Sequence, residues 1–192
     1  MRRSLLVAGF GAFPGFASNP AQIVAQRLEY EKPRFALAGV DLHVAILPVE
    51  REALSPLLSR LFAETGPDAV LLLGVAGRRR CLTIETLARN RVSILKPDAT
   101  RRRAFCRFIV HGGPDLLRTS CSAPRLVALA RRSGLAAAPS RDAGDYLCNE
   151  SLYLSLLMDR RTCFLHLPNW RGAELERAAR VILLMAKDFA IA

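Results

Sequence analysis

Hydrophobic residues in this chain gather into short continuous runs that alternate with longer, periodically patterned stretches. The runs at residues 4–9, 41–49, 68–75 and 162–167 predict buried β-strands, because a strand covered on both faces does not need alternating polar positions. The run at 68–75 is the strongest strand signal, and Gly66-Pro67 separates it from the stretch before it.

The stretches between these runs carry helical signals. Asn19 suits an N-cap and Pro20 suits the first helical position, so a helix is predicted from there to about Tyr30. Leucines at positions 54, 57, 58 and 61 form one apolar stripe, which predicts a helix at residues 50–64. Three further helices are predicted at residues 124–132, 149–160 and 173–190.

The middle of the chain has a weaker pattern. Residues 82–90 fit a strand, or a strand that turns into a loop; residues 96–104 predict a polar, mobile segment, and residues 107–111 an edge strand. The early strands alternate with helices, which implies right-handed βαβ units. We therefore predict an α/β fold: a three-layer αβα sandwich around a mostly parallel twisted sheet, as a single domain over residues 1–192, with functional residues at the carboxyl ends of the strands.

Charge adds one alternative to this picture. Among the 192 residues, 28 are Lys or Arg and 17 are Asp or Glu, so the net charge is +11 and polyanions would be attracted. The arginine clusters at 78–80, 101–103, 131–132 and 160–161 raise the hypothesis of a nucleic-acid-binding module. Neither a known RNA- or DNA-binding signature nor alternating aromatic residues accompany them, which favours solvated loops instead. No run reaches the roughly 18 apolar residues of a membrane span, so no membrane partner is predicted.

Cysteine and histidine usage limits the chemistry. The five cysteines form no CxxC pair and only three histidines are present, so neither a zinc site nor a disulfide framework is predicted. No cofactor is predicted, and a reducing cytoplasm is the expected compartment. Cys106 and Cys163 lie among apolar neighbours and are interpreted as inert buried thiols. Cys81 and Cys121 fall in predicted loops and receive no role.

One cysteine stands in a different context. Small residues precede Cys148 and an amphipathic run follows it, which places it near a helix N-terminus, where the helix dipole favours a thiolate and free N–H groups can hold an oxyanion. An inert buried cysteine remains the alternative. Among the histidines, His43 is interpreted as a sheet residue and His111 as a solvated turn residue. His166 follows an apolar run, at the carboxyl end of a strand, where α/β sites gather.

A carboxylate completes this set of candidates. Glu85 lies between apolar neighbours, where an acid needs either solvent or a partner. A histidine is a suitable partner, because the acid fixes the histidine tautomer and stabilises the imidazolium. Alternation alone would also allow Glu85 to lie on the solvated face of an edge strand.

The segments around these residues resemble the pyroglutamyl peptidase I family of cytosolic cysteine peptidases over nearly the whole chain. The segment GFGAFPG at residues 9–15 resembles the family's GFxPFGG loop, and GVAG at 74–77 with LTIE at 82–85 resembles its glutamate motif. SRDAGDYLCN at 140–149 closely matches the SxxAGxYxCN cysteine motif, and LHLP at 165–168 is similar to IHVP.

The resemblance implies a site and a substrate. Cys148 would be the nucleophile, His166 the base and Glu85 the orienting acid in the removal of an N-terminal pyroglutamyl residue through a thioester acyl-enzyme. Substrate-binding roles would fall to Phe10, Phe13, Val75, Tyr146 and Leu147. Aromatic faces suit a flat, uncharged lactam. The implied partner is a peptide with N-terminal pyroglutamate, and a homo-oligomer is expected because the family commonly forms dimers or tetramers.

Three positions depart from the family pattern, one of them Arg89, which stands where the family has an apolar residue before the asparagine of the glutamate motif. Val75 stands where the family usually has glutamine, and Thr86 replaces the basic residue after the glutamate, although Arg89 or Arg91 could supply that charge from another direction. A site built to hydrogen-bond a lactam loses discrimination when a partner is removed. The alternative is therefore the same fold and triad with altered specificity or little activity.

Overall fold

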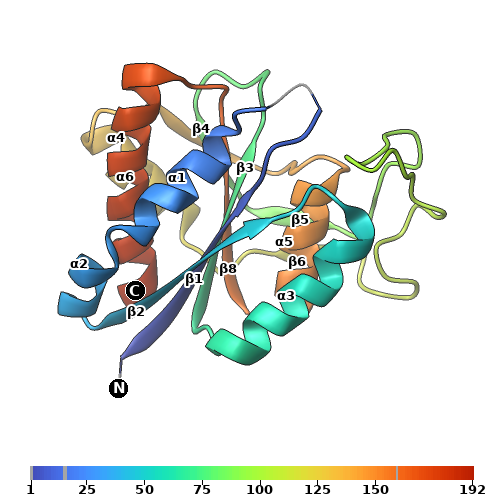
Figure 1. The fold of residues 1–192 in the computed structure, drawn as a ribbon, viewed down its shortest axis with the longest axis horizontal. Coiled ribbons are helices and arrows are strands. Elements are labelled where there is room, and N and C mark those ends of the chain that lie inside the picture. The colour runs from blue at the N-terminus through green and yellow to red at the C-terminus, as the bar shows by residue number, and fades with distance from the viewer. Residues whose placement is uncertain (1, 15–16, 159) are drawn as a thin grey trace.

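The computed structural model describes residues 2–14, 17–158 and 160–192 of the chain. Within these residues the core is a six-stranded sheet with strand order β2-β1-β3-β8-β4-β7 (Figure 1). Its strands are β1 (Arg3–Phe10), β2 (Val40–Leu47), β3 (Ala69–Val75), β4 (Leu82–Glu85), β7 (Ala137–Ser140) and β8 (Arg161–Leu167). The strands predicted at 4–9, 41–49, 68–75 and 162–167 are confirmed, with ends that differ by one or two residues.

The sheet is mostly parallel, as predicted. Strands β2, β1, β3 and β8 run in one direction, whereas β4 is antiparallel to β8 and parallel to its other neighbour β7. This reversal places Thr83 opposite His166 and Glu85 opposite Phe164. Glu85 lies on β4, which pairs with a strand on each side, so it does not belong to an edge strand, and its side chain is fully buried.

Helices cover both faces of the sheet and complete the predicted αβα sandwich (Figure 1). One face is covered by α1 (Pro20–Glu29), α2 (Lys32–Leu37), α4 (Ala123–Arg132) and α6 (Gly172–Ile191), and the other by α3 (Arg51–Thr65) and α5 (Leu147–Leu157). Asn19 caps α1 by accepting a hydrogen bond from the Ala21 N–H, as its position before Pro20 predicts. Within the described residues no helix combines the length and the apolar character needed to cross a membrane.

Strand alternation divides the interior into two hydrophobic cores. Leu71, Leu73 and Leu165 contribute to the core beneath α1, α4 and α6, whereas Leu72 and Phe164 contribute to the core beneath α3 and α5. Because successive side chains of a strand point to opposite faces, neighbouring residues belong to different cores. The catalytic candidates can therefore be assigned to a face by their place in this alternation.

The weakly patterned middle of the chain differs from the prediction. Residues 82–90 form β4, a break at Thr86 and then β5 (Leu87–Arg89), which pairs antiparallel with β6 (Leu116–Arg118). The predicted strand at 107–111 is wrong, because these residues form bends and a turn. The sequence did not predict α2, β6 and β7, since each is short and β7 carries Pro139, a residue tolerated only at sheet edges.

A long loop, residues 90–115, connects β5 to β6 without a helix or strand of its own. At its base the Asn90 side chain accepts from the Ile109 and Val110 N–H groups and donates to the Val110 carbonyl. At its centre the buried carboxylate of Asp98 accepts from three backbone N–H groups, one of them on Arg51 in α3. The polar segment predicted to be mobile is thus tied to the body of the protein.

Candidate active site

His166 and Glu85 form a buried pair on two neighbouring strands. The Nδ1 atom of His166 lies 2.8 Å from Oε1 of Glu85, and their exposed fractions are 4% and 0%. Their strands are held in register by β4–β8 pairing, so the backbone itself sets this distance. A hydrogen bond from Nδ1–H to the carboxylate leaves Nε2 of the neutral ring as a proton acceptor.

Cys148 meets this pair from the helix that covers the same face. Its sulfur lies 2.8 Å from the position that a Cβ atom would take at Gly74, and Phe164 Cζ lies 2.7 Å from that position. Gly74 is the register partner of His166 on β3. Since paired residues of adjacent parallel strands project to the same face about 4.8 Å apart, the sulfur lies on the imidazole's side of the sheet, one strand away. A glycine at position 74 is what leaves room for the thiol.

The position of Cys148 near a helix N-terminus agrees with the prediction, but its protonation state does not. Cys148 is the second residue of α5. Burial, reinforced by the charge of Glu85, raises the pKa of its thiol to about 12, and this outweighs the opposing effect of Arg79. Burial also lowers the pKa of His166, although the hydrogen bond that its ring donates to Glu85 acts in the opposite direction. The free site therefore holds a neutral thiol and a neutral imidazole.

Sequence reasoning missed the cation beside Glu85. The Arg79 guanidinium forms an ion pair with Oε1 of Glu85, donates to the hydroxyl of Thr83, and donates to the Asp142 carbonyl at 2.6 Å. The suggested sources of charge, Arg89 and Arg91, are exposed and form no ion pair with Glu85 in the described residues. A fully buried carboxylate needs an opposite charge; that requirement, and not a motif, was the signal for Arg79.

Four of the five predicted substrate-binding residues lie on the same face of the sheet as Cys148 and His166. Phe10 and Leu147 are buried in the core beneath α3 and α5, and Phe13 and Tyr146 pack against it together with Cys148. The loop that carries the phenylalanines is held at Gly11, whose carbonyl accepts from the Asn19 side chain at 2.8 Å. Gly15 of the same motif lies outside the described residues.

The side chain of Val75, the fifth predicted residue, projects from the opposite face of the sheet. Val75 pairs in register with Leu167, which belongs to the core beneath α1, α4 and α6. Its neighbours Gly74 and His166 point to the other side, so the structure does not bring the Val75 side chain together with the sulfur. Thr86, the second departure from the family pattern, donates its hydroxyl to the Ser140 carbonyl at 2.8 Å.

The remaining thiols and imidazoles lie outside this cluster. Cys163 is buried in the core, as predicted, but Cys106 is exposed in the long loop, so its interpretation as a buried thiol is wrong. His43 is half-buried on the edge strand β2, and His111 is an exposed turn residue. Among the described residues no group of three or more His, Cys, Asp or Glu side chains is arranged to hold a metal ion.

The sandwich fold, with a thiol at a helix N-terminus facing an acid-held imidazole, is that of an α/β thiol hydrolase. Comparison with known proteins makes this class more specific. The family model described as pyroglutamyl peptidase matches residues 3–172, so the chain belongs to the pyroglutamyl peptidase family, whose members are cysteine-type peptidases.

Relatives and solved structures agree with this assignment. The chain is 33% identical over 170 residues to the pyrrolidone-carboxylate peptidase of Thermococcus onnurineus (strain NA1), covering 85% of this chain and 82% of that protein. It is 30% identical over 190 residues to pyroglutamyl-peptidase 1 of Rattus norvegicus, covering 95% and 88%. The crystal structure of pyrrolidone carboxyl peptidase from Thermus thermophilus superposes with a TM-score of 0.84 at 36% identity, covering 97% and 98% of the two chains.

Proposed function

We propose that this protein removes the N-terminal pyroglutamyl residue from peptides, with Cys148 as nucleophile, His166 as general base and Glu85 as the acid that orients the imidazole. The observation that carries the proposal is the shared sheet face: the sulfur rests over Gly74, whose register partner His166 is held by Glu85 at 2.8 Å. Membership of the pyroglutamyl peptidase family supports the substrate class.

The protonation states define the first step. Because the resting thiol has a pKa of about 12, it is not a standing thiolate, and its proton leaves only as sulfur attacks. Nε2 of His166 accepts that proton while the sulfur adds to the carbonyl carbon of the lactam residue. The first-turn N–H groups of α5, which include that of Cys148, hold the developing oxyanion.

The second half of the reaction returns the proton. His166 protonates the leaving amine, the carbon–nitrogen bond breaks and a thioester remains on Cys148. Water then loses a proton to His166 and attacks the thioester; the carbon–sulfur bond breaks, His166 returns the proton to the sulfur, and free pyroglutamate and the thiol result. The buried Glu85 carboxylate stabilises the imidazolium in both halves, and the Arg79 guanidinium forms an ion pair with this carboxylate.

The experiment compares the wild-type protein with Cys148→Ala on a chromogenic pyroglutamyl amide. We expect turnover by the wild type and a loss of at least about a thousandfold in kcat/KM for the variant. Cys106→Ala is the matched control, because it removes an exposed thiol of the long loop and should retain full activity. A wild type without turnover would reject the substrate class, and an active Cys148→Ala would reject the nucleophile.

A further inference from the structure

The surface beside the candidate nucleophile is hollowed into a cleft rich in arginine. Two adjoining hollows, of about 670 Å³ and 570 Å³, share Arg89, Arg91 and Asp145. Arg107 lines the larger hollow and Lys96 the smaller. We call the combined hollow the arginine cleft. It lies where the long loop meets the segment that leads into α5.

The cations of the arginine cleft are only partly neutralised. Lys96 pairs with Asp145 at 2.5 Å. Arg89, Arg91 and Arg107 are exposed and enter no ion pair with any described residue. Two further carboxylates, those of Asp115 and Asp142, line the hollows, so positive charge remains in excess. Unpaired guanidinium groups in a concave surface favour a carboxylate-bearing ligand, because an arginine binds a carboxylate through two parallel N–H donors.

Backbone contacts fix the arginine cleft next to the nucleophile. The side chain of Asn149, the residue after Cys148, donates to the carbonyls of Arg89 and Arg91 at 2.8 and 2.9 Å. The Ser93 N–H donates to the carbonyl of Asp145 at 2.7 Å. Asp145 precedes Cys148 by three residues, so their Cα atoms are at most about 11 Å apart. An extended peptide covers that distance in about three residues.

We propose that the arginine cleft binds the part of the substrate that follows the scissile bond, and that it selects peptides with acidic side chains at the second and third positions after pyroglutamate. This inference rests on the proposed function. Apolar side chains at the rim, Leu95, Phe108 and Leu116, are exposed beside the arginines and suit the mixed character of a peptide. A single aromatic residue in the cleft does not make the stacking surface that a nucleic acid requires.

The test uses two peptides with the same leaving group. Pyroglutamyl-Ala-Glu-Glu-amide and pyroglutamyl-Ala-Gln-Gln-amide share the scissile bond and differ only in the charges that would reach the cleft. We expect kcat/KM to be roughly fivefold higher for the acidic peptide at low salt, from two exposed charge interactions. The ratio should fall towards one in 1 M salt, where the screening length is about 3 Å.

Two triple variants separate the cleft from overall charge. The cleft variant combines Arg89→Gln, Arg91→Gln and Arg107→Gln, and should bring the acidic-to-neutral ratio to about one. The control variant combines Arg132→Gln, Arg177→Gln and Arg180→Gln, which removes the same charge from exposed positions on α4 and α6 and should keep the ratio. The proposal would be overturned if the wild type cleaved both peptides equally. It would also be overturned if the acidic-to-neutral ratio fell by the same factor in the cleft variant and the control variant.

A binding measurement keeps this proposal separable from the proposed function. Calorimetric titration of Cys148→Ala with each peptide needs no turnover, so acidic preference can appear even if neither peptide is cleaved. Cleavage of both peptides without acidic preference would reject the arginine cleft and leave the peptidase assignment intact. A single-stranded oligonucleotide that binds more tightly than the acidic peptide, and loses this binding in the cleft variant, would reassign the surface to nucleic acid.

Discussion

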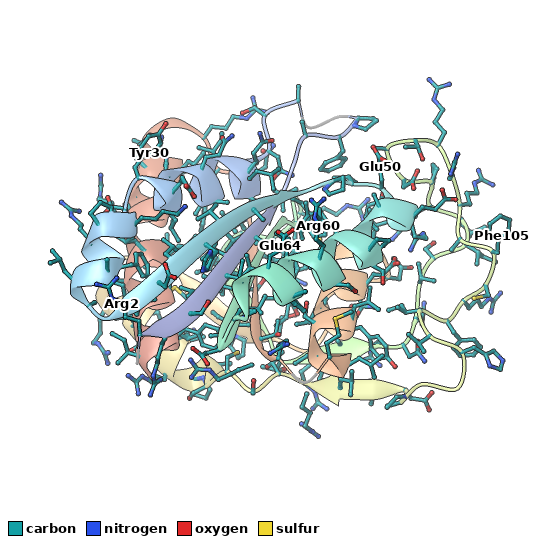
Figure 2. All side chains as sticks on the ribbon, turned by 60° about the horizontal axis from the view of Figure 1, so that its bottom comes forward. Arg2, Tyr30, Glu50, Arg60, Glu64 and Phe105 are labelled. Atoms are coloured by element: carbon teal, nitrogen blue, oxygen red, sulfur yellow. The ribbon has the colours of Figure 1, made fainter. Side chains whose placement is uncertain are left out.

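Two regions of the candidate site are built in opposite ways: the half on the strands, which holds Glu85 and His166, and the half on the long loop, which carries the arginine cleft. Glu85 and His166 lie on paired strands, are almost completely buried and are separated by 2.8 Å. The long loop has no regular secondary structure, and its outer end at Phe105 is fully exposed, far from Arg2 at the other end of the molecule (Figure 2). In the proposed function, sheet register fixes the catalytic pair, whereas the proposed recognition depends on charged loops, which tolerate substitution. Departures from the family can accumulate in the second half without disturbing the first.

The strand-borne half should be the more sensitive to small changes in volume. Gly74→Ala places a methyl group 2.8 Å from the Cys148 sulfur and 2.7 Å from Phe164 Cζ, so the thiol must move. Because a displacement of about 1 Å at a reacting atom costs about a hundredfold, we expect kcat/KM on a pyroglutamyl amide to fall by that factor. Steady-state kinetics together with thermal unfolding would measure both effects.

A double variant distinguishes displacement of sulfur from general destabilisation. Gly74→Ala with Phe164→Leu relieves the contact with the ring but keeps the contact with sulfur. We expect the melting temperature to recover while activity stays low. Recovery of activity along with stability would contradict the placement of the sulfur over Gly74.

The ion pair between Glu150 of α5 and Arg51 of α3 should make the stability of the protein depend on pH. Burial raises the pKa of Glu150 to about 7 from its ordinary value of 4.5, although the ion pair with Arg51 opposes the shift. The folded protein then binds a proton more tightly than the unfolded chain, so this contribution is complete below pH 4.5 and is lost as pH rises through 7. We expect the titration of Glu150 to lower the free energy of unfolding by about 2 kcal/mol between pH 5 and pH 8.

Denaturant unfolding at a series of pH values tests this expectation. Glu150→Gln should flatten the decrease between pH 5 and pH 8, because its side chain does not titrate. Glu64→Gln serves as the control: Glu64 is exposed at the end of α3, with only a long contact to Arg60, and its loss should leave the slope unchanged. Identical slopes in the wild type and Glu150→Gln would show that Glu150 titrates normally.

The cation inside the strand-borne half should tune the pH profile. The charge of Arg79 lowers the pKa of both Cys148 and His166, so Arg79→Met should raise both. The acid limb of kcat/KM reports protonation of the base, which in the wild type should fall below the ordinary histidine value of 6.5. We expect Arg79→Met to shift this limb to higher pH and to lower kcat/KM about tenfold at pH 7.

Two further variants make Arg79 distinguishable from a merely structural residue. Arg79→Lys retains a charge near Glu85 and should keep the wild-type profile, even where the rate falls. Arg80→Met removes an exposed neighbouring charge and should change neither the profile nor the rate. An Arg79→Met protein that is slower but keeps an unshifted acid limb would contradict an electrostatic role.

The same contrast explains what the sequence could predict. The four long strands could be predicted because a short continuous apolar run is typical of a strand in a sheet covered on both faces. The catalytic candidates could be predicted because Cys148 lies at the start of a helix and His166 near the carboxyl end of a strand. The Arg79–Glu85 contact could not be predicted, because it depends on a turn at residues 76–79 and on the reversed direction of β4. Neither feature has a periodic signal.

Some of the misses have a single physical origin. The strand predicted at 107–111 and the buried thiol predicted at Cys106 both assume that apolar neighbours imply a core. In the long loop, apolar residues such as Phe105 instead project into solvent, while Asn90 and Asp98 satisfy the backbone that a sheet would otherwise pair. Local hydrophobicity predicts burial only where a partner surface exists to cover it.

The smallest expected effect concerns the residue that departs most visibly from the family. Val75→Gln restores the amide, but strand alternation directs position 75 towards Leu167 and away from the Cys148 sulfur. We therefore expect kcat/KM on a pyroglutamyl amide to change by no more than about threefold, a difference of about 0.6 kcal/mol. Phe13→Ala is the contrasting variant, because Phe13, like Cys148, packs against the core beneath α3 and α5, and its truncation should cost far more activity. A gain of tenfold or more in kcat/KM for Val75→Gln would show that the side chain at position 75 contacts the lactam. The absence of the amide, rather than the arginine cleft, would then set the specificity of this protein.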